Sequence, residues 1–91
     1  MDNSRFVPLA HIVATQLDDG DGVLVDLNTR QYFQLNETAM LIWRALENGQ
    51  SFDHIVGEII AAYRVSNEHA VASASRLLNQ FYERGLVRPA E

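Results

Sequence analysis

Cysteine and lysine are both missing from this 91-residue chain. Without cysteine it has no disulfides and no thiolate metal ligands. Without lysine, its positive charge comes from seven arginines scattered along the sequence, against twelve acidic residues, and the formal net charge is −5. Proteins that hold nucleic acid through its phosphates usually carry a basic stripe. The charge balance therefore disfavours nucleic acid as a partner.

Long hydrophobic runs are missing as well, and no stretch approaches the roughly 20 apolar residues of a membrane-spanning helix. Residues 1–6 contain no apolar segment of the kind found in a secretory signal. The overall balance, 47% hydrophobic and 21% charged, is that of a globular protein. We expect one cytoplasmic domain over residues 1–91, with no membrane partner, an ordered core over 9–88 and loose ends at 1–8 and 88–91.

The residue patterns of common catalytic and metal sites are also absent. There is no GxSxG, GxGxxG or Walker sequence. His11, His54 and His69 form no HxxxH or HxxE pair with another ligand at metal spacing. The acidic cluster at residues 18–22 lacks the ligand spacing of a calcium loop and predicts a hairpin turn. We expect no catalytic residues, no metal ion, no cofactor and no enzymatic activity.

The first third of the chain is rich in β-forming residues. Segments 11–17, 23–27 and 31–35 predict three strands, separated by turn residues. Strict alternation assigns one apolar face to each of the last two strands: Val23, Val25 and Leu27 on the first, and Phe33 and Leu35 on the second.

The loop between these two strands determines their register. The two-residue loop 28–29 places Val25 opposite Tyr32, and the two apolar faces then disagree. The three-residue loop 28–30 places Val25 opposite Phe33, so that both apolar faces match. Because a one-residue slip turns every side chain to the other face, the burial pattern favours the three-residue loop. Its last residue is an arginine, although the left-handed position of such loops usually carries Gly or Asn.

From Asn36 onward, the apolar spacing becomes helical. Asn36 is a good N-cap for a first helix that ends at Gly49, and Ser51 and Ser66 are N-caps for a second helix and for a third over residues 67–84. The apolar stripes of the first two helices consist of Ala39, Ile42, Trp43 and Leu46, and of Phe52, Ile55, Val56, Ile59, Ile60 and Tyr63. Three strands followed by three helices predict an α+β domain with a small antiparallel sheet.

The third helix has more apolar surface than one contact with the core requires. Its two stripes lie roughly 80–100° apart around the helix. The first consists of Ala70, Ala74, Leu77 and Phe81, and the second of Val71, Ala74, Ser75, Leu78 and Tyr82. The second stripe covers either the sheet, a partner or a groove.

Several short motifs resemble the PqqD-like family, the recognition elements of pathways that modify ribosomally made peptides. The matching segments cover nearly the whole chain: 25–27, 32–39 with its Leu-Asn, 42–46 with its Ile-Trp, 52–56 (Phe-Asp-His-Ile-Val) and 84–87 (Arg-Gly-Leu-Val). Stand-alone members occur in pyrroloquinoline quinone and lasso-peptide biosynthesis. The Tyr-x-x-Leu-Asn and Ile-Trp motifs are more similar to those of the lasso-type and generic members than to those of the quinone-pathway members.

The resemblance implies a winged-helix-like fold, with a three-stranded antiparallel sheet followed by three helices. It also implies a non-catalytic function, in which the leader segment of a precursor peptide adds as a strand to the third strand and is delivered to a separate peptidase, cyclase or radical enzyme. The expected peptide-binding residues lie on that strand and on the second stripe of the third helix: Arg30, Gln31, Tyr32, Phe33, Gln34, Leu35, Val71, Ala74, Ser75, Leu78 and Tyr82. The alternatives are a winged-helix nucleic-acid-binding domain and a structural regulatory subunit.

Overall fold

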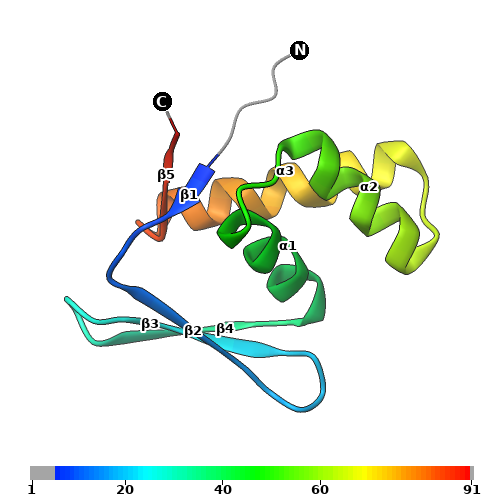
Figure 1. Ribbon diagram of the computed structural model, residues 1–91. Coiled ribbons are helices and arrows are strands. Elements are labelled where there is room, and N and C mark those ends of the chain that lie inside the picture. The colour runs from blue at the N-terminus through cyan, green and yellow to red at the C-terminus, as the bar shows by residue number, and fades with distance from the viewer. Residues whose placement is uncertain (1–5, 91) are drawn as a thin grey trace.

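The computed structural model describes residues 6–90, so the extreme ends of the predicted loose segments, residues 1–5 and 91, lie outside the described residues. Within these residues, five short strands and three helices follow one another (Figure 1). They are β1 (Phe6–Pro8), β2 (Ile12–Gln16), β3 (Gly22–Asp26), β4 (Gln31–Leu35), α1 (Glu37–Glu47), α2 (Phe52–Tyr63), α3 (Asn67–Glu83) and β5 (Val87–Pro89).

Strands β2, β3 and β4 form an antiparallel sheet with β3 in the centre. The α+β class and the order of three strands before three helices are therefore confirmed. In Figure 1, α1 lies between this sheet and the other two helices, so the core forms where the inner face of the sheet meets the helices.

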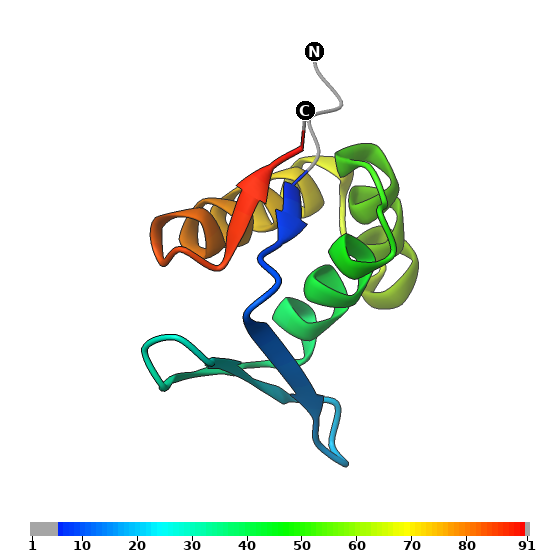
Figure 2. The same cartoon turned by 60° about the vertical axis from the view of Figure 1, so that its left-hand side comes forward.

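Strands β1 and β5 were not predicted, because three-residue segments are too short to show a period. They pair antiparallel as a separate two-stranded ribbon, with Phe6 opposite Pro89, and lie side by side in Figure 2. The ring of Phe6 packs on that of Tyr82, with centroids 6.1 Å apart. Residues 6–8 and 87–89 are thus paired strands, whereas the sequence predicted loose ends that include residues 6–8 and 88–89.

The register predicted for β3 and β4 is wrong. Val25 lies opposite Tyr32, and Leu24 lies opposite Phe33, which is the arrangement of the rejected alternative. The error lies in the assigned face of β3: Leu24 is completely buried, whereas Val25 is only half-buried on the outer face. The prediction chose the side of Val23, Val25 and Leu27, because it carries three apolar residues. The helices instead cover the opposite side of the strand, which carries Leu24.

Two residues, Gly22 and Asp26, explain why the inner face of β3 carries so little apolar surface. At Gly22, a Cβ atom would overlap the side chain of Met40, so this glycine leaves the space that α1 needs to approach the sheet. At Asp26, the buried carboxylate accepts hydrogen bonds from the backbone N–H groups of Asn28, at 2.8 Å, and Thr29, at 3.1 Å. The inner face of β3 therefore combines packing space, one core side chain and a turn-forming carboxylate.

The turn from β3 to β4 spans residues 27–30. The backbone N–H of Arg30 donates to the carbonyl oxygen of Asp26 at 2.6 Å, and Arg30 adopts a left-handed φ of 65°. This conformation is unfavourable for a residue other than Gly or Asn. The hydrogen bonds to Asp26 hold the turn in this conformation.

Each predicted N-cap is confirmed. The side chains of Asn36, Ser51 and Ser66 accept hydrogen bonds from the backbone of the first turns of α1, α2 and α3, respectively. The core stripe of α1 is buried as expected, with Ile42 and Trp43 completely inaccessible. The indole N–H of Trp43 donates to Glu47 at 3.0 Å, and its ring meets Phe81 edge-on at 5.4 Å.

Replacing Trp43 by alanine should destabilise the fold by about 3–5 kcal/mol, because it leaves a cavity where α1 meets α3. Urea unfolding followed by circular dichroism measures this loss. The matched control is Tyr32→Ala, which removes a side chain that is 73% exposed and should change stability by at most about 0.5 kcal/mol. Equal stability of the two variants would contradict the assignment of Trp43 to the core.

The turn carboxylate predicts a pH dependence. Burial alone would raise the pKa of Asp26, but hydrogen bonds from Thr29 and Asn28, with the nearby His11, hold the pKa below its ordinary value. A lowered pKa in the folded state stabilises the protein above the pKa of the unfolded state, about 3.9. This contribution is lost as the pH falls through the folded-state pKa. The difference in melting temperature between the parent and Asp26→Asn should therefore shrink from pH 7 to pH 3. A difference in melting temperature that stays the same at every pH would contradict the lowered pKa of Asp26.

Candidate functional site

The sheet order leaves an outer edge of β2 and an outer edge of β4 without a strand partner within residues 6–90. The β4 edge consists of five neutral residues, Gln31–Leu35, without proline or charge. Natural proteins usually protect such edges with charges, prolines or bulges, because free N–H and C=O groups invite pairing. The edge of β4 has none of these protections and is suited to accept an additional strand.

A hollow of about 220 Å³ lies between β4 and α3. Leu35, Phe81 and Leu86 provide buried apolar side chains in it, whereas Gln34, Gln80 and Arg84 are exposed. The guanidinium of Arg84 lies 5.8 Å from the centre of the Phe33 ring, a cation–π contact that bridges α3 and β4. The hollow thus offers apolar contacts surrounded by amide groups and one positive charge, next to the free backbone edge.

The predicted residues of β4 divide between the two faces of the sheet. Phe33 and Leu35 lie toward the helices and line the hollow, together with Gln34. Tyr32 lies on the outer face and is 73% exposed. Arg30 lies in the turn before the strand, next to the exposed Gln31. The strand half of the predicted site is therefore contiguous along one edge.

The helix half of the predicted site is not brought to this edge. Val71 and Ser75 line a different hollow, between α2 and α3. Ala74 and Leu78 are buried in the core. Tyr82 packs against Phe6 of the β1–β5 ribbon. The sequence defined two stripes on α3, and the structure does not place the second one beside β4. Its role in peptide binding stays a prediction.

The residues of α3 that do line the β4 hollow are Leu77, Gln80 and Phe81, and they are joined by Arg84, the C-cap of the helix. Leu77 and Phe81 belong to the first stripe, and Gln80 and Arg84 continue the helix surface beyond it. The helical period shows that these positions share one side. It does not show whether the sheet lies clockwise or anticlockwise from the core stripe, so periodicity alone could not have identified this wall.

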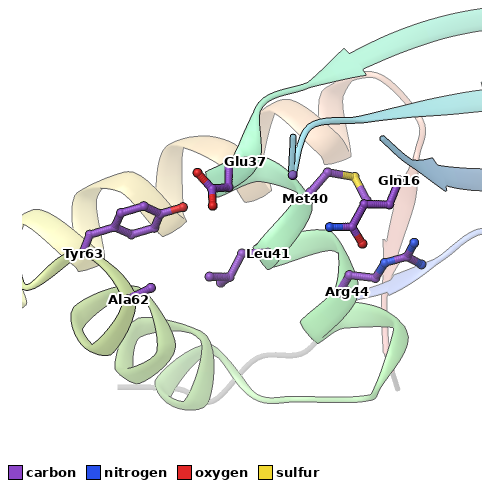
Figure 3. A pocket seen from close by; sticks show the side chains of 8 residues that line it. Gln16, Glu37, Met40, Leu41, Arg44, Ala62 and Tyr63 are labelled. Atoms are coloured by element: carbon purple, nitrogen blue, oxygen red, sulfur yellow. The ribbon is translucent and has the colours of Figure 1, made fainter. Parts of the chain in front are cut away.

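Further hollows lie elsewhere on residues 6–90, and two of them border α2 or the end of β2. The larger, of about 610 Å³, separates α2 from α3 and is lined mainly by apolar side chains such as Phe52, Val56 and Ile60. The other, of about 260 Å³, lies beside the end of β2 (Figure 3). There the hydroxyl of Tyr63 points toward Glu37, and Arg44 is engaged in an ion pair with Glu47 at 2.8 Å.

Charged and ionisable groups are dispersed over the molecule. Within residues 6–90, no three His, Cys, Asp or Glu side chains gather into a group that could hold a metal ion. His54 pairs with Glu58 at 3.1 Å on the exposed side of α2, and His11 lies 3.7 Å from the carboxylate of Asp26. In the same part of the chain, none of the helices combines the length and hydropathy needed to cross a membrane.

Comparison with solved structures identifies two close matches in fold. The chain titled "TbiB1 in Complex with the TbiA(beta) Leader Peptide" has a TM-score of 0.84 and 27% identity, over 90% of this chain and 94% of that one. "Lasso peptide synthetase B1 complexed with the leader peptide" has a TM-score of 0.83 and 30% identity, over 93% of this chain and 99% of that one. The winged-helix-like arrangement expected from the resemblance is therefore confirmed.

Among curated proteins, none matches this sequence. The family model for coenzyme PQQ synthesis protein D matches residues 21–87, from the start of the β3 region to the first residue of β5. This range contains β3, β4 and all three helices, and hence both walls of the β4–α3 hollow. The chain belongs to the PqqD family.

Proposed function

We propose that this chain binds the leader segment of a ribosomally made precursor peptide, which adds as a strand to the free edge of β4. The observation that carries the proposal is the coincidence of an unprotected strand edge with a hollow beside it. In strand addition, the backbone groups of the edge provide affinity, and pockets for alternate side chains provide specificity. The two similar structures are complexes with leader peptides.

The edge of β4 suits this role better than the edge of β2. The hollow beside β4 borders three consecutive residues of that strand, Phe33, Gln34 and Leu35, and combines buried apolar side chains with polar groups that include Arg84. The hollow beside the end of β2 borders only Gln16 of that strand, so it accompanies the β2 edge over a shorter length. Leader residues on one side of the added strand would enter the β4–α3 hollow, and the alternate residues would lie on the outer face beside Tyr32.

The chain acts as a non-catalytic adaptor in the cytoplasm and delivers the bound leader to a separate modifying enzyme, a peptidase, cyclase or radical enzyme. The residues of the motifs at 32–36 and 42–43, together with the two similar structures, favour a role of this chain in lasso-peptide biosynthesis. Nucleic-acid binding gains no support from the fold, because Arg84 is engaged with Phe33 and the net charge is −5.

The absence of catalysis in this proposal predicts that the domain, incubated alone with precursor peptide, leaves the mass of the peptide unchanged.

A pair of tryptophan substitutions on α3 tests the position of the groove. Gln80→Trp places a large side chain at the exposed side of the β4–α3 hollow and should weaken leader binding at least about tenfold, or about 1.4 kcal/mol. Ser75→Trp places the same side chain toward α2 and should leave leader affinity within about twofold. Fluorescence anisotropy with a labelled lasso-precursor leader peptide that binds the parent protein measures both.

Circular dichroism of both variants shows whether the fold is preserved. The reverse result, with Ser75→Trp blocking the leader and Gln80→Trp having no effect, would restore the second stripe of α3 as the groove wall. Amide-shift mapping provides an independent measurement, in which shifts should concentrate in residues 30–35 and in the C-terminal half of α3. Shifts confined to α1 and α2 would contradict strand addition at β4.

A further inference from the structure

Helix α2 carries a row of residues that the fold of one chain does not bury. Asp53, Gly57, Ile60 and Arg64 follow one another at spacings of four, three and four residues. At about 100° per residue, the four positions lie within about 60° of one another on one side of the helix. Ile60 is half-buried and the other three are exposed. We refer to these four residues as the α2 row, and their spacing is that of the seam between two packed helices.

Gly57 is an unexpected residue for the interior of α2, because glycine lowers the stability of a helix relative to alanine. Its φ is not positive, so no left-handed turn requires a glycine at this position. A Cβ atom added here would meet no packed neighbour within 4 Å, so close packing within residues 6–90 does not require it either. The missing side chain instead suits the close approach of a partner from outside the chain.

The α2 row borders the hollow of about 610 Å³ between α2 and α3. Asp53, Gly57 and Ile60 line it from α2, and the exposed Val71 and Ser75 line it from α3. The α3 wall of this hollow carries no charged side chain. A helix lying along the α2 row would therefore pack against α2 and beside α3 without meeting a charge on α3.

The order of residues in the α2 row is complementary to its own reverse. Asp53 and Arg64 stand at its opposite ends, and neither forms an ion pair within residues 6–90. If the α2 helices of two copies lie antiparallel, Asp53 of each copy faces Arg64 of the other, and the space at Gly57 faces the side chain of Ile60. Each contact then occurs twice, as in a two-fold symmetric interface. A second copy of this chain therefore fits the row in both charge and shape.

We propose that the α2 row is a self-association surface, at which two copies of this chain pair through antiparallel α2 helices. The surface is about 18 Å long, the length of the 12 residues of α2, and about 20 Å wide with the adjoining side of α3. Each copy thus contributes roughly 360 Å², less than the about 800 Å² of a standard interface. The dimer is accordingly weak and reversible, with a dissociation constant between about 10 μM and 1 mM.

Pairing through α2 leaves the β4–α3 hollow accessible. The two hollows share no lining residue, and α1 lies between the three-stranded sheet and α2 (Figure 1). Two paired copies would therefore hold two leader peptides, one on each β4 edge. This stoichiometry rests on the proposed function, whereas the self-association does not depend on leader binding.

The substitution Gly57→Gln tests the packing at the centre of the pair. Glutamine favours a helix more than glycine does, so the single chain should keep its fold. Its side chain fills the space that Ile60 of the second copy needs, and association should weaken at least about tenfold. The matched control is Ala62→Gln, at an exposed position about 140° around α2 from Gly57, which should change association by at most about twofold. Sedimentation equilibrium without leader peptide, from about 10 μM to 1 mM chain, measures the dissociation constants.

Two charge reversals test the antiparallel orientation. Asp53→Arg and Arg64→Asp each bring like charges together at both ends of the pair, so each variant alone should associate at least about fivefold more weakly than the parent at low salt. In an equimolar mixture, the two variants are complementary at both ends. They should pair with each other about as tightly as the parent pairs with itself. Circular dichroism of each variant shows whether the helices are preserved.

A parent protein that remains monomeric at 1 mM would overturn the proposal, and so would equal association of the parent and Gly57→Gln. A mixture of the two charge-reversed variants that associates no better than either variant alone would overturn the antiparallel arrangement. Because these measurements contain no leader peptide, a negative result leaves the proposed function intact. Failure of the parent to bind a leader would in turn leave the self-association intact.

Discussion

The pairing of β3 with β4, held by the turn at Asp26, is the constraint on which the functional surfaces depend. Its register decides which side chains of both strands face the helices and which face solvent, because strand side chains alternate. The buried side-chain carboxylate of Asp26 accepts hydrogen bonds from two backbone N–H groups of the turn. The backbone carbonyl oxygen of Asp26 accepts a third hydrogen bond, from the N–H of Arg30. A slip by one residue would bury Tyr32 and expose Phe33.

The two faces of β4 carry different parts of the proposed function. On the inner side, Phe33 and Leu35 contribute to a hollow whose opposite wall is α3. On the outer side, Tyr32 and Gln34 lie opposite Val25 and Val23 of β3. A single added strand would place its alternate side chains on both faces. The two similar structures, each a complex with a leader peptide, are consistent with the proposed binding of a leader.

The core determines how firmly these surfaces are held. Trp43 of α1 meets Phe81 of α3 edge-on, and Phe81 also lines the β4–α3 hollow. The same α3 position thus contributes to the core and to the candidate site. Met40 occupies the space left by Gly22, which brings α1 against the sheet. The groove wall is consequently part of the rigid core, which favours binding with little rearrangement.

The sequence by itself determined the secondary structure of residues 11–83, the three N-caps and the core side chains of α1, because these features depend on local spacing and local hydrogen bonds. It also determined the family, through motifs such as the Ile-Trp of α1 and the Arg-Gly-Leu-Val that leads into β5. Only the tertiary structure decided the inward face of β3, the pairing of β1 with β5, and the side of α3 that faces β4. Each of these depends on contacts between residues distant in the sequence. A helical or strand period defines which residues share a face, but not what that face contacts.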